Sequence, residues 1–312
     1  MNEKILLIGS GGFLGQHVKK LLMKDRYNFI EISGKDDVDI TDLKSFDSFL
    51  SSKNIHTIIN CSAFVGGIAF GYKFQGELLS KNSLMGINIY KLSLKHKIKR
   101  IINPISNCAY PGHLSVYDEK NFWDGAPHES VFNYALSKRL IVGLGKSYFE
   151  QYGVSTSNVI LSNMYGPFDH FEEERSHALG AIVKKTFDAH KNGKKNIKIW
   201  GTGKPVREWL YITDGATSLV KAMELDEGNY LFNIGVNKGS SINEIAAYIA
   251  SAFKWKGTFE NDLTKPDGVM RKTVNGDYGK ELLSWSPEVK LEDGITETVE
   301  WYIDYFNKKK IN

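Results

Sequence analysis

The pattern of apolar and polar positions in the first half of the chain alternates between two periods. Four short and nearly continuous apolar runs predict buried strands, at residues 4–9, 27–33, 56–63 and 99–106. Between these runs, apolar residues recur at the spacing of amphipathic helices, at residues 13–24, 42–53 and 83–97, with Asp42 as a capping residue. Apolar strands that alternate with helices predict βαβ units and a parallel sheet covered on both faces.

The second half of the chain has a different pattern. We expect a further strand within residues 155–167, a helix within 177–193, and two short strands around a Gly-Pro turn within 197–212. Another helix is expected at residues 241–253, with Ser241 as its cap. No internal repeat or low-complexity linker separates the halves. We therefore predict an α/β protein with a Rossmann doubly wound parallel sheet and a smaller, interwoven α/β domain.

Composition narrows the class of protein. Apolar residues make up 42% and charged residues 24% of the 312 positions, as in ordinary globular proteins. The formal charge is only +4 and no basic tract is interleaved with aromatics, so we expect no nucleic-acid partner. Two cysteines form neither a disulfide framework nor a metal-binding spacing. No signal-peptide pattern opens the chain, and no apolar run approaches the ~18 residues that span a bilayer. We expect a soluble, cytoplasmic protein without a metal or a membrane partner.

A glycine-rich loop follows the first predicted strand. Gly9, Gly12 and Gly15 form a G-x-x-G-x-x-G pattern where that strand ends and a helix begins. The first glycine permits a tight turn, the second lets the backbone approach a pyrophosphate, and the third lets helix and strand pack closely. The helix N-terminus offers free N–H groups to phosphate oxygens. This context predicts a dinucleotide site, NAD(P)(H), with candidate contacts at Gly9, Gly12, Phe13, Leu14, Gly15, Lys35, Asp39, Ile40 and Ala63.

The choice between NAD and NADP is not readable from the chain. An NAD site usually has an acidic residue at the end of the second strand, and an NADP site has a basic residue there. Ser33 occupies that place, with Lys35 close by. Lys35 could meet a 2′-phosphate, but Asp36 and Asp37 would oppose it. Both cofactors therefore stay open.

A second group of polar residues suggests catalysis. Tyr134 and Lys138 lie four positions apart, on one face of a predicted helix. A lysine at this spacing can favour the phenolate of a nearby tyrosine and so lower its pKa. Such a tyrosine can pass a proton to or from a hydroxyl or carbonyl during hydride transfer. Ser106 lies at the end of the fourth predicted strand, where ligands bind in open α/β sheets.

These motifs resemble a known family. The glycine pattern, Ser106 and Tyr134-x-x-x-Lys138 are similar to those of extended short-chain dehydrogenases/reductases, in the nucleotide-sugar epimerase/dehydratase branch. Stretches along almost the whole chain, in the same order, resemble the GDP-L-fucose synthase group of 3,5-epimerase-4-reductases: SAFVGGI, SNCAYPG, NYALSKRL, NMYGPFDHF, SHALGAIVKKTF, WGTGKPVREWLYITD and KPDGVMRK. The resemblance implies a Rossmann domain at residues 1–164 and about 208–236, and a nucleotide-sugar domain at 165–207 and 237–312.

The resemblance also implies residue roles. Ser106 and Tyr134 bind the substrate oxygen at C4, with Lys138 holding the tyrosine and the nicotinamide ribose. Cys108 and His177 match the group's epimerisation pair, which moves protons at carbons beside the 4-keto group. A buried cysteine without a chemical role is the competing interpretation for Cys108. The residues that would contact the GDP-sugar are Asn163, Lys185, Trp200, Arg207 and Arg271, of which Arg207 best matches a diphosphate.

The chain departs from this group in two places. Ser10 and Gly11 stand where a basic residue helps to hold NADP, and residues 112–133, near the sugar in this fold, differ from the expected sequence. A C4 dehydrogenase or 4-epimerase of a related GDP-hexose or GDP-heptose therefore stays open. A dehydratase is disfavoured because Asn107 and Cys108 replace its Asp-Glu pair. A non-catalytic dinucleotide sensor is the rival from another class. The resemblance further implies a role in surface polysaccharide biosynthesis and a homodimer joined through a four-helix face.

Overall fold

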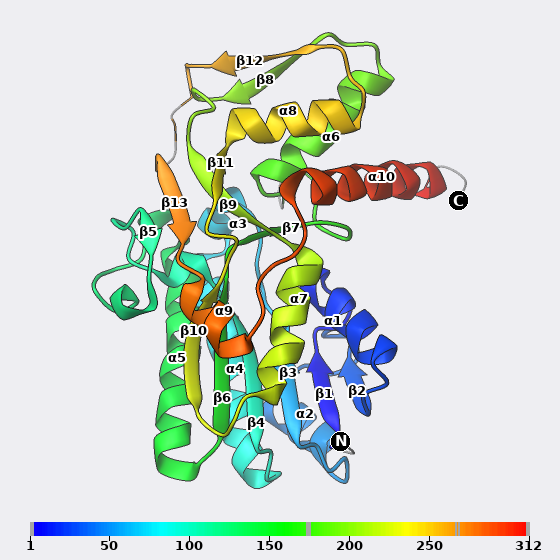
Figure 1. Ribbon diagram of the computed structural model, residues 1–312. Coiled ribbons are helices and arrows are strands. Elements are labelled where there is room, and N and C mark those ends of the chain that lie inside the picture. The colour runs from blue at the N-terminus through cyan, green and yellow to red at the C-terminus, as the bar shows by residue number, and fades with distance from the viewer. Residues whose placement is uncertain (1–2, 173–175, 266, 268, 310–312) are drawn as a thin grey trace.

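A six-stranded parallel sheet forms the lower part of the computed structural model, which describes residues 3–172, 176–265, 267 and 269–309 (Figure 1). The strand order is β10-β6-β4-β3-β1-β2, so the chain crosses over between the two halves of the sheet. Every neighbouring pair in it is parallel. The strands are β1 Ile5–Ile8, β2 Phe29–Ile32, β3 Thr57–Asn60, β4 Arg100–Ser106, β6 Ser155–Leu161 and β10 Asn229–Ile234.

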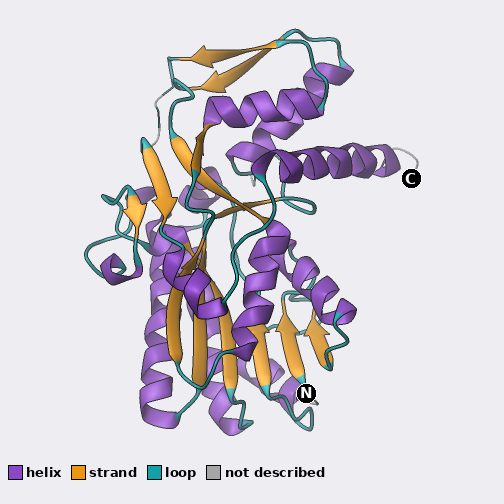
Figure 2. Ribbon diagram, in the orientation of Figure 1, coloured by secondary structure: helices purple, strands orange, loops and turns teal. Residues whose placement is uncertain are grey.

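Helices cover both faces of this sheet (Figure 2). They are α1 Phe13–Lys24, α2 Leu43–Leu50, α4 Gln75–Lys95, α5 Phe132–Tyr152, α7 Ile212–Lys221 and α9 Asp277–Leu283, while the short helix α3 Ile68–Lys73 packs against α4. Helices α4 and α5 pack along each other, and α1 packs against α7. Asp42 caps α2 by accepting hydrogen bonds from the backbone N–H groups of Lys44 and Ser45, as its sequence position predicts. The Rossmann α/β fold expected from the sequence is confirmed.

A smaller region sits above the carboxyl ends of the sheet strands (Figure 1). Its strands β11-β9-β13-β5 form one sheet with β7 added beside β9, and β12 pairs with β8. The two strands expected within residues 197–212 exist, but they pair with other strands and not with each other. The strands are β5 Val116–Tyr117, β7 Asn163–Tyr165, β8 Asn196–Trp200, β9 Val206–Tyr211, β11 Gly239–Ser241, β12 Thr258–Asp262 and β13 Arg271–Val274.

Three helices complete the upper region, α6 Ala178–Lys191, α8 Ile242–Ala252 and α10 Leu291–Lys309. Ser241 caps α8 in a reciprocal arrangement with Glu244, which fixes where that helix begins. Short 3₁₀ turns connect other elements: η1 Asn107–Ala109, η2 Glu119–Asn121, η3 Glu129–Val131 and η4 Ala222–Glu224. Residues from β5, β10 and β13 meet beside η1, so distant parts of the chain build the wall around one strand end.

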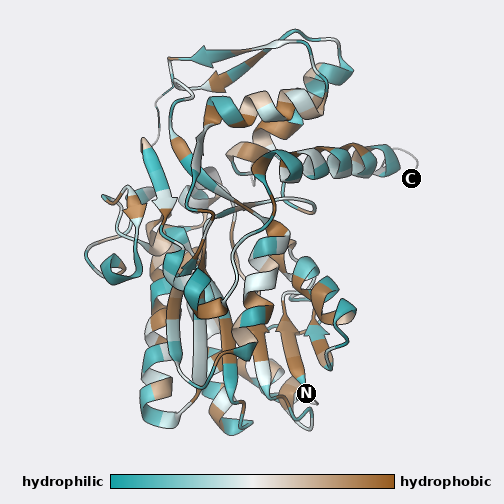
Figure 3. Cartoon of the chain, in the orientation of Figure 1, coloured by the Kyte–Doolittle hydropathy of each residue, from teal (hydrophilic) through white to brown (hydrophobic). Residues whose placement is uncertain are grey.

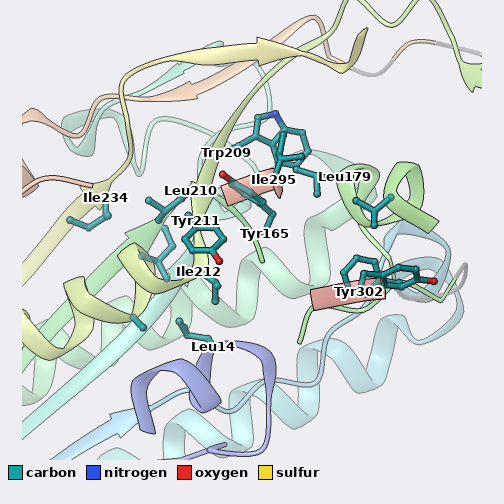
Figure 4. Packing of buried hydrophobic residues seen from close by; sticks show 14 of the residues in the cluster. Leu14, Tyr165, Leu179, Trp209, Leu210, Tyr211, Ile212, Ile234, Ile295 and Tyr302 are labelled. Carbon is teal, nitrogen blue, oxygen red and sulfur yellow. The ribbon is translucent and has the colours of Figure 1, made fainter. Parts of the chain in front are cut away.

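The strands at the centre of the lower sheet are largely hydrophobic (Figure 3), and buried side chains form a core on each of its faces. One core continues upward into the smaller region, where Leu14 of α1 belongs to the same cluster as Tyr211 and Ile212 (Figure 4). This shared core joins the two parts of the molecule. Within the described residues, no helix is long and apolar enough to cross a membrane, and no group of three or more acidic, histidine or cysteine side chains could hold a metal.

Candidate active site

The glycine loop joins β1 to α1 and packs against the neighbouring strands without room for side chains. Gly9 has a φ of +80°, and a Cβ on it would lie 2.8 Å from the backbone carbon of Cys61. A Cβ on Gly15 would lie only 2.0 Å from the carbonyl oxygen of Gly9. Gly12 precedes the first turn of α1, and no side chain caps the helix there. The free N–H groups of this turn are therefore available to an anion.

A cavity of about 360 Å³ opens beside this loop. It is lined by six of the residues expected to contact the cofactor: Gly9, Gly12, Lys35, Asp39, Ile40 and Ala63. Phe13, Leu14 and Gly15 do not line it, and the side chain of Leu14 is buried in the core. Because Gly9 and Gly12 leave the loop backbone open to the cavity beside an uncapped helix end, the residues present fit a dinucleotide with its phosphates at α1.

A second cavity, of about 200 Å³, lies at the carboxyl end of β4 and the start of α5. Five of the predicted catalytic and substrate residues line it together: Ser106, Cys108, Tyr134, Asn163 and His177. They come from β4, η1, α5, β7 and the start of α6. The two cavities adjoin along the segment after β3, since residues 61–64 line the first and residues 65–67 line the second. A ligand that fills the first cavity can therefore reach toward Tyr134.

Ser106 is the last residue of β4 and holds the turn that follows. Its Oγ accepts a hydrogen bond from the backbone N–H of Cys108 at 3.3 Å. Arg139 of α5 fixes the same turn, because its Nε donates to the carbonyl oxygen of Ala109 at 2.7 Å. Burial raises the pKa of the Cys108 thiol, while the hydroxyl of Ser106 and the charge of Lys138 act in the opposite direction. The thiol is thus predominantly protonated near neutral pH.

Tyr134 and Lys138 lie one turn apart on α5, but their electrostatics differ from the expectation. Burial raises the pKa of the Tyr134 hydroxyl, and nearby Cys108 adds to this effect. The Nζ of Lys138 lies 5.6 Å from the centroid of the tyrosine ring and donates to the carbonyl oxygen of Pro104 at 3.2 Å. Burial lowers the pKa of Lys138 to about 8. Lys138, which was expected to lower the pKa of the tyrosine, is therefore not among the groups that shift it, and burial raises that pKa instead.

His177 directly precedes α6 and lines the second cavity together with Cys108. His177 is exposed to solvent. Desolvation by the protein atoms around the imidazole lowers its pKa, and nearby His170 lowers it further. A neutral imidazole can accept a proton at physiological pH. The structure thus brings the thiol and the imidazole to one cavity, on the same side as Tyr134 and Ser106.

Four predicted substrate residues lie outside both cavities, in the upper region. Lys185 of α6 lies 6.0 Å from the ring centroid of Trp200, and both side chains are exposed. Arg207 of β9 is half-buried and its Nη1 donates to the carbonyl oxygen of Val206 at 2.8 Å. Arg271 begins β13 and pairs in register with Val206, beside Arg207. Lys272, the next residue of β13, is in register with Arg207, so the side chains of Arg207 and Arg271 project from opposite faces of these strands.

Sequence reasoning missed much of the second cavity's wall. Neighbouring Gln75 and Asn133 both line it, with their side-chain amides 3.4 Å apart. The sequence can indicate where a helix starts, but it does not reveal that α3, the beginning of α4 and η3 converge beside the carboxyl end of β4. The segment 112–133 was expected near the sugar, and its last residues are in the wall. The further lining residues are Val65, Gly66, Gly67, Gly71, Tyr72, Leu78, Asn107, Glu129, Ser130, Val131 and Phe132.

The chain is similar along nearly its whole length to several known proteins. GDP-L-colitose synthase of Yersinia pseudotuberculosis is 30% identical, with 97% of this chain and 99% of that protein covered. GDP-L-fucose synthase 1 of Arabidopsis thaliana is 28% identical, with 97% and 94% covered. The crystal structure of a GDP-L-fucose synthetase from Naegleria fowleri bound to NADP has a TM-score of 0.90 at 28% identity, covering 98% of this chain and 94% of that one. Residues 5–235 match the model of the NAD dependent epimerase/dehydratase family, and the chain therefore belongs to that family.

Proposed function

We propose that this protein is an NAD(P)-dependent oxidoreductase and epimerase that acts at C4, and also at C3 and C5, of a GDP-linked 4-ketosugar. The observation that carries the proposal is the convergence of Ser106, Tyr134, Cys108 and His177 on one cavity that adjoins the glycine-loop cavity. The relatives named as GDP-L-fucose and GDP-L-colitose synthases support the GDP-sugar as substrate. A role in nucleotide-sugar biosynthesis for surface polysaccharide follows from that substrate.

At C4, Tyr134 is the proposed proton donor. Its raised pKa keeps the hydroxyl protonated, which suits donation to an oxygen that gains negative charge as the 4-keto group is reduced. Ser106 offers a second hydroxyl at the end of β4, and buried Lys138 offers a positive charge behind the tyrosine. A bound nicotinamide supplies the hydride. Lys185, Trp200, Arg207 and Arg271 of the upper region are proposed to hold the nucleotide and its diphosphate.

At C3 and C5, Cys108 and His177 are the proposed proton carriers. A proton beside a ketone is acidic because the carbonyl takes up the charge that remains. Thiol and imidazole on one cavity wall can remove and return such protons. The raised pKa of Cys108 favours a second candidate function, a C4 dehydrogenase or 4-epimerase of a related GDP-hexose or GDP-heptose, because a protonated thiol is a weak base. Deuterium exchange at C3 and C5 separates these two functions.

The catalytic proposal is tested by replacing one hydroxyl. Tyr134→Phe removes the proton donor and is expected to lower kcat for oxidation of NADH or NADPH with GDP-4-keto-6-deoxymannose about 10²- to 10⁴-fold. The matched control is Tyr152→Phe, since Tyr152 lies on the same helix with an exposed ring and should leave the rate unchanged. Full activity of Tyr134→Phe, or no activity of the wild-type chain with any GDP-4-ketosugar, would contradict the proposal.

We also propose a homodimer. Helices α4 and α5 lie side by side (Figure 1), and each has exposed apolar side chains. Leu84 and Ile87 of α4 are 44% and 38% exposed, and Leu140 of α5 is 38% exposed. Pairing of this face with a second copy would bury these side chains in a bundle of four helices.

A further inference from the structure

The side chain of Arg139 joins three separate parts of the chain. Its Nε donates to the carbonyl oxygen of Ala109 at 2.7 Å, and its Nη2 donates to the carbonyl oxygen of Phe122 at 3.0 Å. The guanidinium carbon also lies 5.6 Å from the ring centroids of both Phe122 and Trp123. A planar guanidinium can bridge two carbonyls in this way, whereas a lysine offers a single ammonium group. Arg139 therefore ties α5 to the turn η1 and to the segment 112–133.

The turn η1 is held on both sides of Cys108. On one side, the backbone N–H of Cys108 donates to the Oγ of Ser106 at 3.3 Å. On the other side, Arg139 holds the carbonyl oxygen of Ala109, a residue without exposed surface. The half-buried Cys108 lines the second cavity from this turn. The position of its thiol therefore depends on the two contacts that fix the backbone around it.

Tyr110, the residue after η1, packs against the segment 112–133 through its ring. The ring stacks on that of Tyr117 with the centroids 4.7 Å apart, and it meets the ring of Phe122 edge-on at 5.2 Å. Tyr117 and Phe122 are both buried, so these contacts are part of the core. The segment 112–133 is also where the chain departs from the sequence expected for its group. Arg139 and these rings therefore connect the divergent segment to the turn that carries Cys108.

We propose that Arg139 is a positioning residue for proton transfer at C3 and C5, because it fixes the Cys108 thiol relative to α5. Tyr134, the proposed proton donor at C4, lies on α5 itself, so its place does not depend on the turn η1. The two steps should therefore respond differently to the loss of Arg139. A reacting group displaced by about 1 Å slows its step about 10²-fold. This inference rests on the proposed function, since it assumes that Cys108 carries protons at C3 and C5.

The ratio of two rates tests the inference. Arg139→Met removes both donors, and we expect it to slow deuterium exchange at C3 and C5 about tenfold to a hundredfold while C4 reduction changes less than about threefold. A general loss of folding would lower both rates together and leave their ratio unchanged. Arg139→Lys keeps the charge and one donor, so its exchange rate should lie between those of the wild type and Arg139→Met. Lys146→Met, on an exposed part of the same helix, is the matched control and should change neither rate.

A second measurement needs no turnover. The purified chain is treated with iodoacetamide, and mass spectrometry of its peptides gives the rate of alkylation at Cys108, with Cys61 in the same sample as the reference. We expect Arg139→Met to speed alkylation of Cys108 at least about threefold relative to Cys61, because a released turn gives the thiol more water and favours the reactive thiolate. If Arg139→Met does not fold, Arg139→Lys serves for both measurements, with smaller shifts in the same directions.

The outcomes separate the inference from the proposed function. If the wild type exchanges deuterium and the ratio of exchange to C4 reduction is the same in Arg139→Met, the inference is overturned and the proposed function stands. Alkylation of Cys108 that is unchanged or slower in Arg139→Met also overturns it. If the wild type reduces C4 without incorporating deuterium, the proposed function fails at C3 and C5. Alkylation alone then decides whether Arg139 fixes the thiol.

Discussion

Lys138 is required by the proposed reaction but destabilises the folded chain. Its side chain is 3% exposed, and burial lowers its pKa from an ordinary value of 10.5 to about 8. At ~1.4 kcal/mol per pH unit, the protonated form is disfavoured in the folded state by about 3 kcal/mol. Lys138→Met keeps most of the volume and removes the charge. It leaves the carbonyl oxygen of Pro104 without this donor, which costs about 1 kcal/mol.

We therefore expect Lys138→Met to raise the free energy of unfolding at pH 7 by about 2 kcal/mol. The sign of the pH dependence follows from proton binding. Between pH 8 and 10.5 the unfolded chain holds a proton on Lys138 that the folded chain has lost, so wild-type stability rises with pH across this range. The penalty is complete below pH 8 and absent above 10.5. The advantage of the variant should shrink through this range and reverse to about −1 kcal/mol.

Urea unfolding followed by circular dichroism at pH values from 7 to 11 measures the difference between the two proteins. Lys146→Met is the matched control, because Lys146 lies on the same helix with its side chain 67% exposed. It should change stability by less than about 0.5 kcal/mol and show no dependence on pH between 8 and 10.5. The reasoning is refuted if Lys138→Met destabilises the protein at pH 7, or if its effect stays constant up to pH 11.

Two further predictions concern epimerisation and assembly. In deuterated water, the 4-ketosugar should gain deuterium at C3 and C5, as mass and NMR analysis would show. Cys108→Ser or His177→Asn should slow this exchange at least about tenfold while reduction at C4 continues. If the wild-type reaction incorporates no deuterium, the C4-only candidate is supported. Light scattering should give the mass of two chains for the wild-type protein, and a monomer would disprove the dimer. Leu84→Glu should yield monomers. Leu263→Glu is the control and should not, because Leu263 is an exposed apolar residue of another surface.

Local rules predicted five of the six strands of the lower sheet, and the sequence analysis missed the edge strand β10. The apolar runs and the turn residues between them predicted the strands before and after the glycine loop, because strands buried on both faces are mostly apolar. Caps at Asp42 and Ser241 were readable for the same reason, since each side chain satisfies N–H groups two or three residues away. The glycine spacing also reflects a local contact, because Gly15 lies directly against the backbone of Gly9, six residues earlier, where a Cβ would not fit.

Polar residues inside the strands show where local rules end. Asn103 of β4 is buried, and its side-chain nitrogen donates to the hydroxyl of Tyr90 at 2.9 Å and to Asn158 of β6 at 3.2 Å. No pattern in the sequence announces that these side chains satisfy one another across neighbouring strands. The pairing of β9 with β7, β11 and β13 was equally hidden, because the partners are separated by long stretches of chain.

The sequence by itself determined the main strands and helices of the first half of the chain, the glycine loop and the residue types that can perform the chemistry. Only the tertiary structure decided what those residues do to one another. It turned Asp37 back to the end of β2, and it joined Lys35 to Asp39. It also buried Lys138 and placed half-buried Tyr134 on a cavity wall, and desolvation shifts the pKa of each. The physical reason is that a charge and its solvation depend on every neighbour in space, whereas a sequence pattern records only neighbours along the chain.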